Sequence, residues 1–221
     1  PYRAFQSSSV QSSASILSER GYHTVCVHPN APEFFSRHKV FPNMGFSEFI
    51  DISAFDDSQK FGPYISDAAV TQKIRDLLND AKKPLFIFAI TMENHGPLHL
   101  ETSTTEDVER FYNSPPPEGY NDLSVYLRHL ANADAMIGQL RDYFSESGQD
   151  VCFCWYGDHV PSMPDVYDHI GFNDSHTNYL VWTGAENPAT NQPLAVESLG
   201  KLLLSCALPE AVTASEQQET I

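Results

Sequence analysis

Residues 85–97, LFIFAITMENHGP, contain the stretch that decides the fold: an apolar run with a polar turn directly after it. The run Leu85–Thr91 shows no alternation of polar and apolar residues, which is typical of a strand buried on both faces of a parallel sheet. In the turn that follows, Gly96 and Pro97 indicate a sharp change of direction that would present His95. The stretch therefore predicts a functional site at the carboxyl end of a central strand.

Similar apolar runs recur along the chain and are separated by helical patterns. Two more runs, Thr24–His28 and Val151–Tyr156, predict buried parallel strands, and Tyr179–Thr183 is a plausible fourth strand. Apolar residues at helical spacing predict helices at Ser13–Arg20, Asp67–Ala81, Asp122–Ser147 and Leu194–Leu204. Strands that alternate with helices predict an α/β fold of three layers, in which helices flank a mostly parallel central sheet.

Polar side chains follow three of these strands at their carboxyl ends. His28 ends the first strand, the turn 93–97 follows the second, and Gly157-Asp158-His159 follows the third without a gap. Ligands of open α/β sheets bind outside the carboxyl ends of the strands. We therefore expect these three segments to contribute to one site.

Asp158 and His159 are candidate metal ligands, since a carboxylate oxygen beside an imidazole suits Mn²⁺, Zn²⁺ or Mg²⁺. The alternative is an Asp that caps a loop next to an exposed His. His95 could bind phosphate or sulfate oxygens or protonate a leaving group. The alternative for His95 is a hydrogen bond to a loop carbonyl. The residues by themselves leave both pairs of alternatives open.

Arg37 follows His28 by nine residues and is a candidate phosphate ligand, because a guanidinium matches phosphate geometry with two hydrogen bonds. An ordinary surface arginine is the alternative. The adjacent Phe34 and Phe35 belong either to the core or to the wall of a pocket, and the core is the commoner place for such a pair. The remaining histidines lack a context that distinguishes them; apart from His176 they are His23, His38, His99, His129 and His169.

Composition excludes several classes of function. The chain has 221 residues and a net charge of −16, which argues against the broad basic surface needed to bind nucleic acid or anionic lipid head groups. An anionic substrate would need local positive charge from a metal, an Arg or a His. Free, buried thiols are expected rather than disulfides for the four cysteines, which are Cys26, Cys152, Cys154 and Cys206. No stretch approaches the roughly 20 apolar residues of a membrane span.

The chain is expected to form one partial domain over residues 1–208, with a polar tail over residues 209–221. It opens on Pro1-Tyr2-Arg3 without Met. We therefore expect it to begin inside a longer protein, with any membrane anchor or export signal upstream.

Five segments, taken in order, resemble the sulfatase-like domain of lipoteichoic acid synthases and related phosphoglycerol transferases, and the resemblance covers about residues 9–183. These segments are Ser15–Leu17 with Gly21–Val25 and Val27–Asn30, then Phe34–Arg37, Met44–Asp51, Thr91–Pro97 and Tyr156–Pro161. Each segment alone is modest, but their common order is specific. The resemblance implies an alkaline phosphatase-like fold, truncated here at its N-terminus.

The resemblance also implies roles for particular residues. Asp158 and His159 would bind a catalytic divalent metal, usually Mn²⁺ in this family, with Mg²⁺ or Zn²⁺ as alternatives. His95 would be catalytic. The residues that would hold the substrate are His28, Phe35, Arg37, Asn94 and His95. A metal-activated Thr would take phosphoglycerol from a phosphatidylglycerol-like donor and pass it to a glycan or polymer hydroxyl. Such enzymes work at the extracytoplasmic face of the cytoplasmic membrane.

One part of the family pattern has no counterpart in this sequence. The family's nucleophilic Thr and remaining carboxylate ligand lie upstream of the matching segment, and nothing in residues 1–27 replaces them. We therefore expect no nucleophile in this chain, and the fragment would be inactive and could lack its metal. A phosphodiesterase, phosphatase or sulfatase of the same fold, or a binding protein without catalysis, remains an alternative.

Overall fold

The structure is a computed structural model that describes residues 2–184 and 191–208. The expected tail, 209–221, lies outside the described residues. The chain divides into two compact units, residues 1–140 with 161–175 and residues 141–160 with 176–221. Each unit is described by itself.

The first unit contains a parallel sheet of three strands. β1 (His23–Val27) lies between β2 (Glu48–Ile50) and β5 (Leu85–Ala89), and both neighbours pair with it in parallel. In this register Cys26 lies beside Phe49 on one side and Phe88 on the other. The parallel sheet that the apolar runs predict is confirmed, with β1 and β5 starting within one residue of the expected positions.

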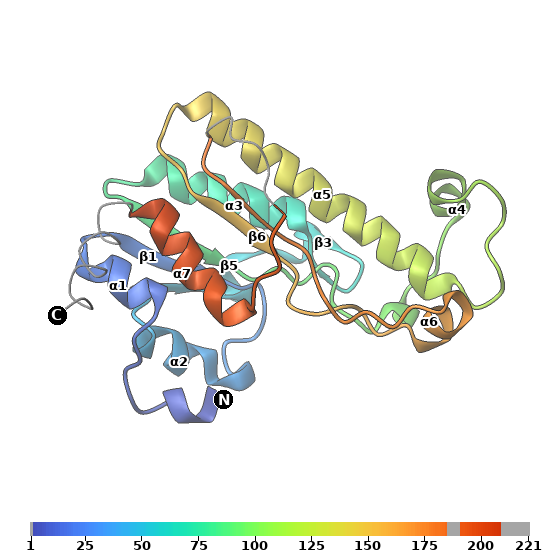
Figure 1. Cartoon of the computed structure of the whole chain (residues 1–221), viewed down its shortest axis with the longest axis horizontal. Helices are drawn as coiled ribbons and strands as arrows, with labels where there is room; N and C mark the ends of the chain where they lie inside the picture. The colour runs from blue at the N-terminus through green and yellow to red at the C-terminus, as the bar shows by residue number, and fades with distance from the viewer. Residues whose placement is uncertain (1, 185–190, 209–221) are drawn as a thin grey trace. The chain divides into compact units, whose positions relative to one another are not determined.

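Helices cover both faces of this sheet. Figure 1 shows α3 (Asp67–Asp80) above its strands and α1 (Ser13–Glu19) and α2 (Arg37–Asn43) below them. An aromatic cluster joins the lower layer, because its residues interleave at ring distances of about 5–6 Å. The buried members of this cluster are Ala14, Cys26, Phe41 and Phe46, and the half-buried members are Met44, Phe49, Phe86, Phe88 and Ile90. The three-layer arrangement is thus set by side chains from α1, α2 and all three strands.

The first unit also contains a short hairpin, further helices and several 3-10 turns. A short hairpin, β3 (Lys60–Phe61) with β4 (Tyr64–Ile65), precedes α3. The other helices are α4 (Thr105–Phe111), α6 (Pro164–Ile170) and the long α5 (Asn121–Ser147), which belongs to this unit up to Leu140 and to the second unit from Arg141. The single 3-10 turns are η1 (Tyr2–Phe5), η2 (Phe34–Ser36), η3 (Ile52–Ala54), η4 (Asp57–Gln59) and η5 (Leu98–Leu100). A second apolar cluster, which includes Leu98, Val125 and Val166, packs η5, α5 and α6 together.

The second unit contains an antiparallel pair, β6 (Phe153–Tyr156) with β7 (Tyr179–Trp182), and the helix α7 (Val196–Ala207). The prediction that Val151–Tyr156 forms a parallel strand is therefore wrong, because β6 pairs with β7 in the antiparallel direction. An apolar run reports that a strand is buried, but its direction depends on the connection that follows, here residues 157–178. Phe144, near the end of α5, packs on Phe153 with their ring centres 5.6 Å apart.

All four cysteines are free thiols, as expected, although only Cys26 is fully buried. Cys152 lies close enough to Cys154 and Cys206 for their charges to affect its titration, and burial raises the pKa of Cys152 to about 12. The Cys152 thiol therefore stays protonated at neutral pH.

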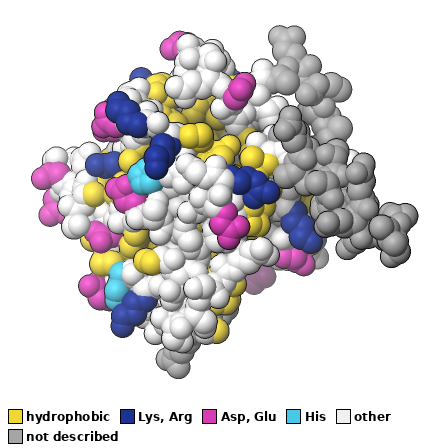
Figure 2. Space-filling view, turned by 90° about the vertical axis from the view of Figure 1, so that its left-hand side faces the viewer, with side chains coloured by type: hydrophobic (Ala, Val, Ile, Leu, Met, Phe, Trp, Pro, Cys, Tyr) yellow, Lys and Arg dark blue, Asp and Glu magenta, His cyan; other side chains and the backbone are white. Residues whose placement is uncertain are grey.

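The surface shows no broad positive area on the face drawn in Figure 2, where acidic and basic side chains of the described residues are interspersed. Within residues 2–184 and 191–208, no helix is both long and apolar enough to cross a membrane.

Candidate functional site

His28 and Arg37 form a buried pair just beyond the carboxyl end of β1. His28 is fully buried, and its Nδ1 donates to the carbonyl of Ile90, 2.9 Å away. That proton assignment leaves Nε2 as an acceptor, and it receives a hydrogen bond from the Arg37 guanidinium. Burial lowers the pKa of His28 to about 4 against the effect of the Ile90 bond, with the charges of Arg37 and His95 adding to the lowering. His28 is therefore neutral at pH 7 and holds a cation beside it.

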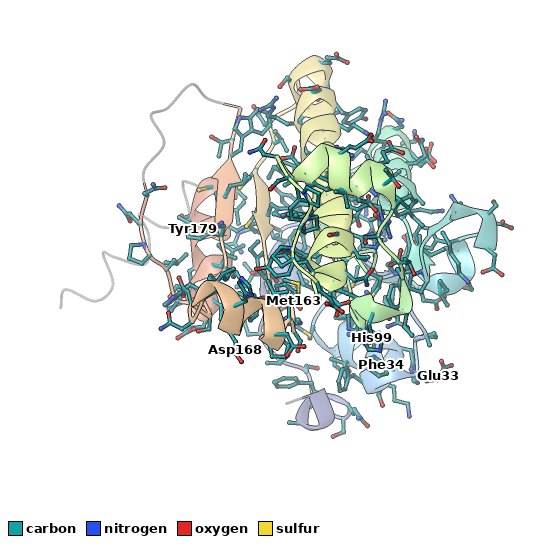
Figure 3. All side chains as sticks on the ribbon, turned by 90° about the vertical axis from the view of Figure 1, so that its right-hand side faces the viewer. Glu33, Phe34, His99, Met163, Asp168 and Tyr179 are labelled. Carbon is teal, nitrogen blue, oxygen red and sulfur yellow. The ribbon has the colours of Figure 1, made fainter. Side chains whose placement is uncertain are left out.

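The backbone before Arg37 is tightly bent and exposes two aromatic rings. Phe35 and Ser36 have φ angles of 54° and 55°, in the left-handed region that side chains rarely adopt. The bend leaves Phe34 51% and Phe35 54% exposed, and Figure 3 shows Phe34 projecting from this segment. The Arg37 guanidinium lies 5.4 Å and 5.6 Å from the two ring centres, within the range of a cation–π contact.

This geometry decides two of the alternatives left by the sequence. Phe34 and Phe35 are not core residues, because each is more than half exposed. Arg37 is not an ordinary surface arginine, since it is only 8% exposed. Its Nε is buried and has no hydrogen-bond partner among the described residues. A buried guanidinium with an unused donor is well suited to bind an anion.

The turn after β5 presents His95 at the same edge of the sheet. His95 is exposed, and its Nδ1 donates to the carbonyl of Gly96, 2.7 Å away. The Tyr64 ring meets His95 edge-on at 5.6 Å, and the Tyr64 hydroxyl donates to the Gly96 carbonyl. The bond to a loop carbonyl is therefore real, yet it leaves Nε2 of His95 available. The neighbouring Asn94 is half-buried, and its Oδ1 has no partner among the described residues.

Behind this turn lies a buried network centred on Glu93 and His129. The Glu93 carboxylate, 2% exposed, accepts from the Asp67 backbone N–H at 2.6 Å, from His129 Nδ1 at 3.0 Å and from Asn132 Nδ2 at 2.6 Å. His129, with no exposed surface, also bonds the Glu101 carboxylate through Nε2 at 2.8 Å. Burial lowers the pKa of His129, but its bonds to Glu93 and Glu101 outweigh burial and raise it overall.

The network continues outward from α5. Arg128 donates to Glu101 at 2.8 Å and to Asp107 at 2.7 Å. Burial opposes ionisation of Asp107, but hydrogen bonds from Thr104 and the charge of Arg128 lower its pKa overall. An open pocket of about 360 Å³ lies against the Glu93 side, lined mainly by the hairpin strand β3 and by α5.

Asp158 and His159 follow β6 in the second unit and are both highly exposed. Asp158 Oδ1 caps the backbone N–H of His159, and His159 Nδ1 donates to the Val160 carbonyl. His159 Nε2 thus keeps a free lone pair, 3.7 Å from Asp158 Oδ2. Two ligands of one ion, each at about 2.1 Å, lie at most about 4.2 Å apart, so this pair fits two positions around a divalent metal. Among the described residues, no group of three or more His, Cys, Asp or Glu side chains could hold one.

The structure brings four of the residues expected from the sequence, Arg37, His28, Asn94 and His95, to the carboxyl ends of two neighbouring strands. Asp158 and His159 lie in the other unit, so the single site expected from all three segments is not tested. Sequence reasoning missed His129. Its only signal was a histidine in a long amphipathic helix, which does not reveal a carboxylate partner 36 residues away.

A family model described as Sulfatase matches residues 4–202. The chain belongs to the sulfatase family. The motif order read from the sequence is consistent with this membership.

Three proteins illustrate what this sulfatase-family chain is similar to. A protein of Rhizobium meliloti (strain 1021), provisionally named a cyclic beta-1,2-glucan modification protein, is 26% identical over 207 residues, or 86% of this chain and 32% of its own length. The structure of the lipoteichoic acid synthase LtaP from Listeria monocytogenes superposes with a TM-score of 0.70 at 21% identity, covering 85% of this chain and 50% of LtaP. The phosphoglycerol transferase GacH of Streptococcus pyogenes, solved with sn-glycerol-1-phosphate, gives 0.64 at 26% identity, covering 84% and 50%.

These likenesses confirm an alkaline phosphatase-like α/β fold. The chain spans between 23% and 32% of the length of the curated relatives that it matches. The activity of the whole protein is therefore a matter for proposal.

Proposed function

We propose that this chain is part of a phosphoglycerol transferase. It would transfer phosphoglycerol from a phosphatidylglycerol-like lipid to a hydroxyl of a glycan or polymer, at the extracytoplasmic face of the cytoplasmic membrane. The relatives support this choice, because one is solved with sn-glycerol-1-phosphate and another is named for glucan modification. Residues 1–208 would form part of the catalytic domain.

The observation that carries the proposal is the environment of Arg37, which suits the binding of an anion. The guanidinium is buried, has a free Nε donor, and is held by a neutral His28 rather than by a carboxylate. No carboxylate neutralises it among the ion pairs of the described residues. Its positive charge is therefore available to a phosphoryl group, in a protein whose net charge is −16. The exposed face of Phe35 would contact the glycerol carbons.

The side chains around Arg37 would each have a separate role in the transfer. Arg37 would bind the phosphoryl oxygens, and Asn94 would donate a further hydrogen bond to them. Because His28 has no exposed surface, it would act only by holding Arg37 in place. His95, whose Nδ1 donates to the Gly96 carbonyl, would use a protonated Nε2 to give a proton to the alkoxide of the leaving diacylglycerol. In the first transfer the bond from the enzyme's nucleophile to phosphorus would form as the bond to the diacylglycerol oxygen breaks, which leaves Nε2 of His95 without its proton. In the second transfer the acceptor hydroxyl would form its bond to phosphorus, the nucleophile would leave, and the hydroxyl proton would return to Nε2 of His95.

Asp158 and His159 would hold a divalent metal, with Mn²⁺ as the first choice and Mg²⁺ or Zn²⁺ as alternatives. Such an ion supplies a lowered pKa for a bound nucleophile and neutralises charge on phosphoryl oxygens. An ion held by this pair alone would fill its remaining positions with water or with other groups. We expect this chain by itself to be inactive.

The first test is binding of sn-glycerol-1-phosphate to this chain, followed by calorimetry or NMR. We expect measurable binding that Arg37→Lys weakens about tenfold or more, because an ammonium cannot replace the planar donors. Glycerol without phosphate serves as the ligand control, and Arg20→Lys, an exposed arginine of the same unit, as the protein control. Equal affinity in wild type and Arg37→Lys would contradict the phosphate role of Arg37.

A second test separates transfer from hydrolysis in the longer protein. A labelled phosphatidylglycerol analogue is supplied with and without a soluble glucan. Label that appears on the glucan supports a transferase, whereas release of free glycerol phosphate at the same rate in both samples identifies a hydrolase of the same fold.

A further inference from the structure

The segment that carries His95 is attached to the protein at both of its ends by one side chain. Glu93 stands at the start of residues 93–101 and Glu101 at their end. His129 bonds the Glu93 carboxylate through Nδ1 at 3.0 Å and the Glu101 carboxylate through Nε2 at 2.8 Å. The imidazole therefore spans the two ends of the segment and ties them to α5.

His129 can make both bonds well only as an imidazolium. A neutral imidazole has one N–H donor, whereas carboxylates only accept, so two carboxylate partners require two donors. The raised pKa of His129, caused by these two partners against the effect of burial, agrees with this geometry. A cation with no exposed surface thus joins two anions, and the edge of the Phe61 ring closes the site at 5.5 Å.

Several elements packed around His129 contribute a charge or a donor to this arrangement, whereas β3 contributes the apolar ring of Phe61. Glu93 is held further by Asn132 of α5 and by the backbone N–H that opens α3. Glu101 is held further by Arg128 of α5, which also bonds Asp107 of α4. The charge of His129 also affects a further buried carboxyl, that of Asp67 of α3.

Such a network is poorly explained by stability alone. Burying ions costs more than burying apolar side chains of similar volume, so a buried ion cluster is weak evidence for stability. It does define geometry, because every member has a fixed partner. By contrast, the contacts that His95 itself makes are few. Its backbone N–H donates to the Met92 carbonyl, its Nδ1 donates to the Gly96 carbonyl, and its ring packs against the ring of Tyr64.

We infer that His129 is a positioning residue for His95: it clamps Glu93 and Glu101, and so fixes the direction in which His95 presents Nε2. The inference rests on the proposed function for the role of His95, but the clamp itself is a property of this chain. It places a determinant of the site on α5, outside all five motifs that identify the family.

The test compares His129→Gln with wild type by NMR of selectively labelled histidine. In the wild type we expect a single set of His95 ring signals with one titration curve. The variant can bond only one carboxylate well, so His95 should show shifted or broadened ring signals and a changed titration midpoint. Affinity for sn-glycerol-1-phosphate should fall about fivefold or more. His99→Gln, an exposed histidine in the same segment, is the control and should change neither readout.

The two readouts separate the possible failures. If the wild type does not bind sn-glycerol-1-phosphate, the proposed function is contradicted, while the His95 signals still decide the clamp. If His129→Gln lowers stability but leaves the His95 signals unchanged, His129 is merely structural and the inference is overturned.

Glu101→Gln answers the same question should His129→Gln fail to fold. Glu101 lies at the less buried end of the clamp, with 17% of its side chain exposed. A changed His95 titration in Glu101→Gln supports the clamp, and an unchanged one overturns it.

Discussion

Replacement of Asp67 by Asn is expected to stabilise the first unit, and to do so more at pH 8 than at pH 5. Asp67 is the first residue of α3 and is 1% exposed. Neither of its carboxyl oxygens has a hydrogen-bond partner among the described residues. Burial and then the charge of Glu93 raise its pKa from the ordinary 3.8 to about 7, while His129 acts in the opposite direction.

The sign of the pH dependence follows from this raised pKa. The unfolded chain releases the proton near pH 4, whereas the folded protein holds it up to about pH 7. The contribution of Asp67 to stability is therefore complete below pH 4 and is lost as the pH rises to 7. Each pKa unit corresponds to about 1.4 kcal/mol, so the wild type loses roughly 4 kcal/mol at pH 8 and about 2 kcal/mol at pH 5.

Asn is nearly isosteric with Asp and carries no charge to bury. It forgoes the favourable interaction of a carboxylate with the helix N-terminus, which is worth about 0.3–1 kcal/mol. At pH 5 the folded carboxyl is protonated and has no such interaction to lose, so the expected net gain in the free energy of unfolding is about 3 kcal/mol at pH 8 and about 2 kcal/mol at pH 5. His129 titrates in both proteins, so its contribution largely cancels in the comparison.

The assay is urea unfolding followed by far-UV circular dichroism at pH 5, 6, 7 and 8. Asp80→Asn, at the exposed end of the same helix, is the matched control and should change stability by less than about 0.5 kcal/mol at every pH. A gain that does not vary with pH, or an Asp67→Asn variant that is less stable than wild type at pH 8, would refute the reasoning.

Three further predictions concern the backbone, a helix cap and the metal pair. Gly45→Ala should lower stability by about 1–3 kcal/mol, measured by urea unfolding, because φ is +91° and a Cβ would lie 2.5 Å from the Ser15 Cα. Ser12→Ala should cost about 1 kcal/mol in the same assay, since its hydroxyl caps α1; an effect no larger than that of Ala at another exposed serine would contradict the cap. Asp158→Asn and His159→Gln should each weaken Mn²⁺ binding at least tenfold in calorimetry and abolish turnover of the longer protein without unfolding it. Unchanged binding or retained turnover in either variant would exclude it as a metal ligand.

The sequence by itself determined the class of fold and the positions of several of its helices and strands. Apolar runs without alternation gave β1 and β5, and helical spacing gave α1, α3 and α5, each within about two residues. These patterns are local, because an apolar run or a helical period can be recognised from residues that are close together in the sequence. The same locality explains why β2 and α4 were not foreseen: β2 has three residues, and α4 has only two apolar residues, Val108 and Phe111.

Only the tertiary structure decided which of these residues are partners. The exposure of Phe35, the burial of Arg37 against His28, and the antiparallel pairing of β6 all depend on how distant segments meet. The clearest case is His129, whose partners lie 36 and 28 residues away in the chain. Its role depends on a buried environment in which two carboxylates require a cation between them. The local pattern of a helix does not specify which charged side chains will be brought together by packing.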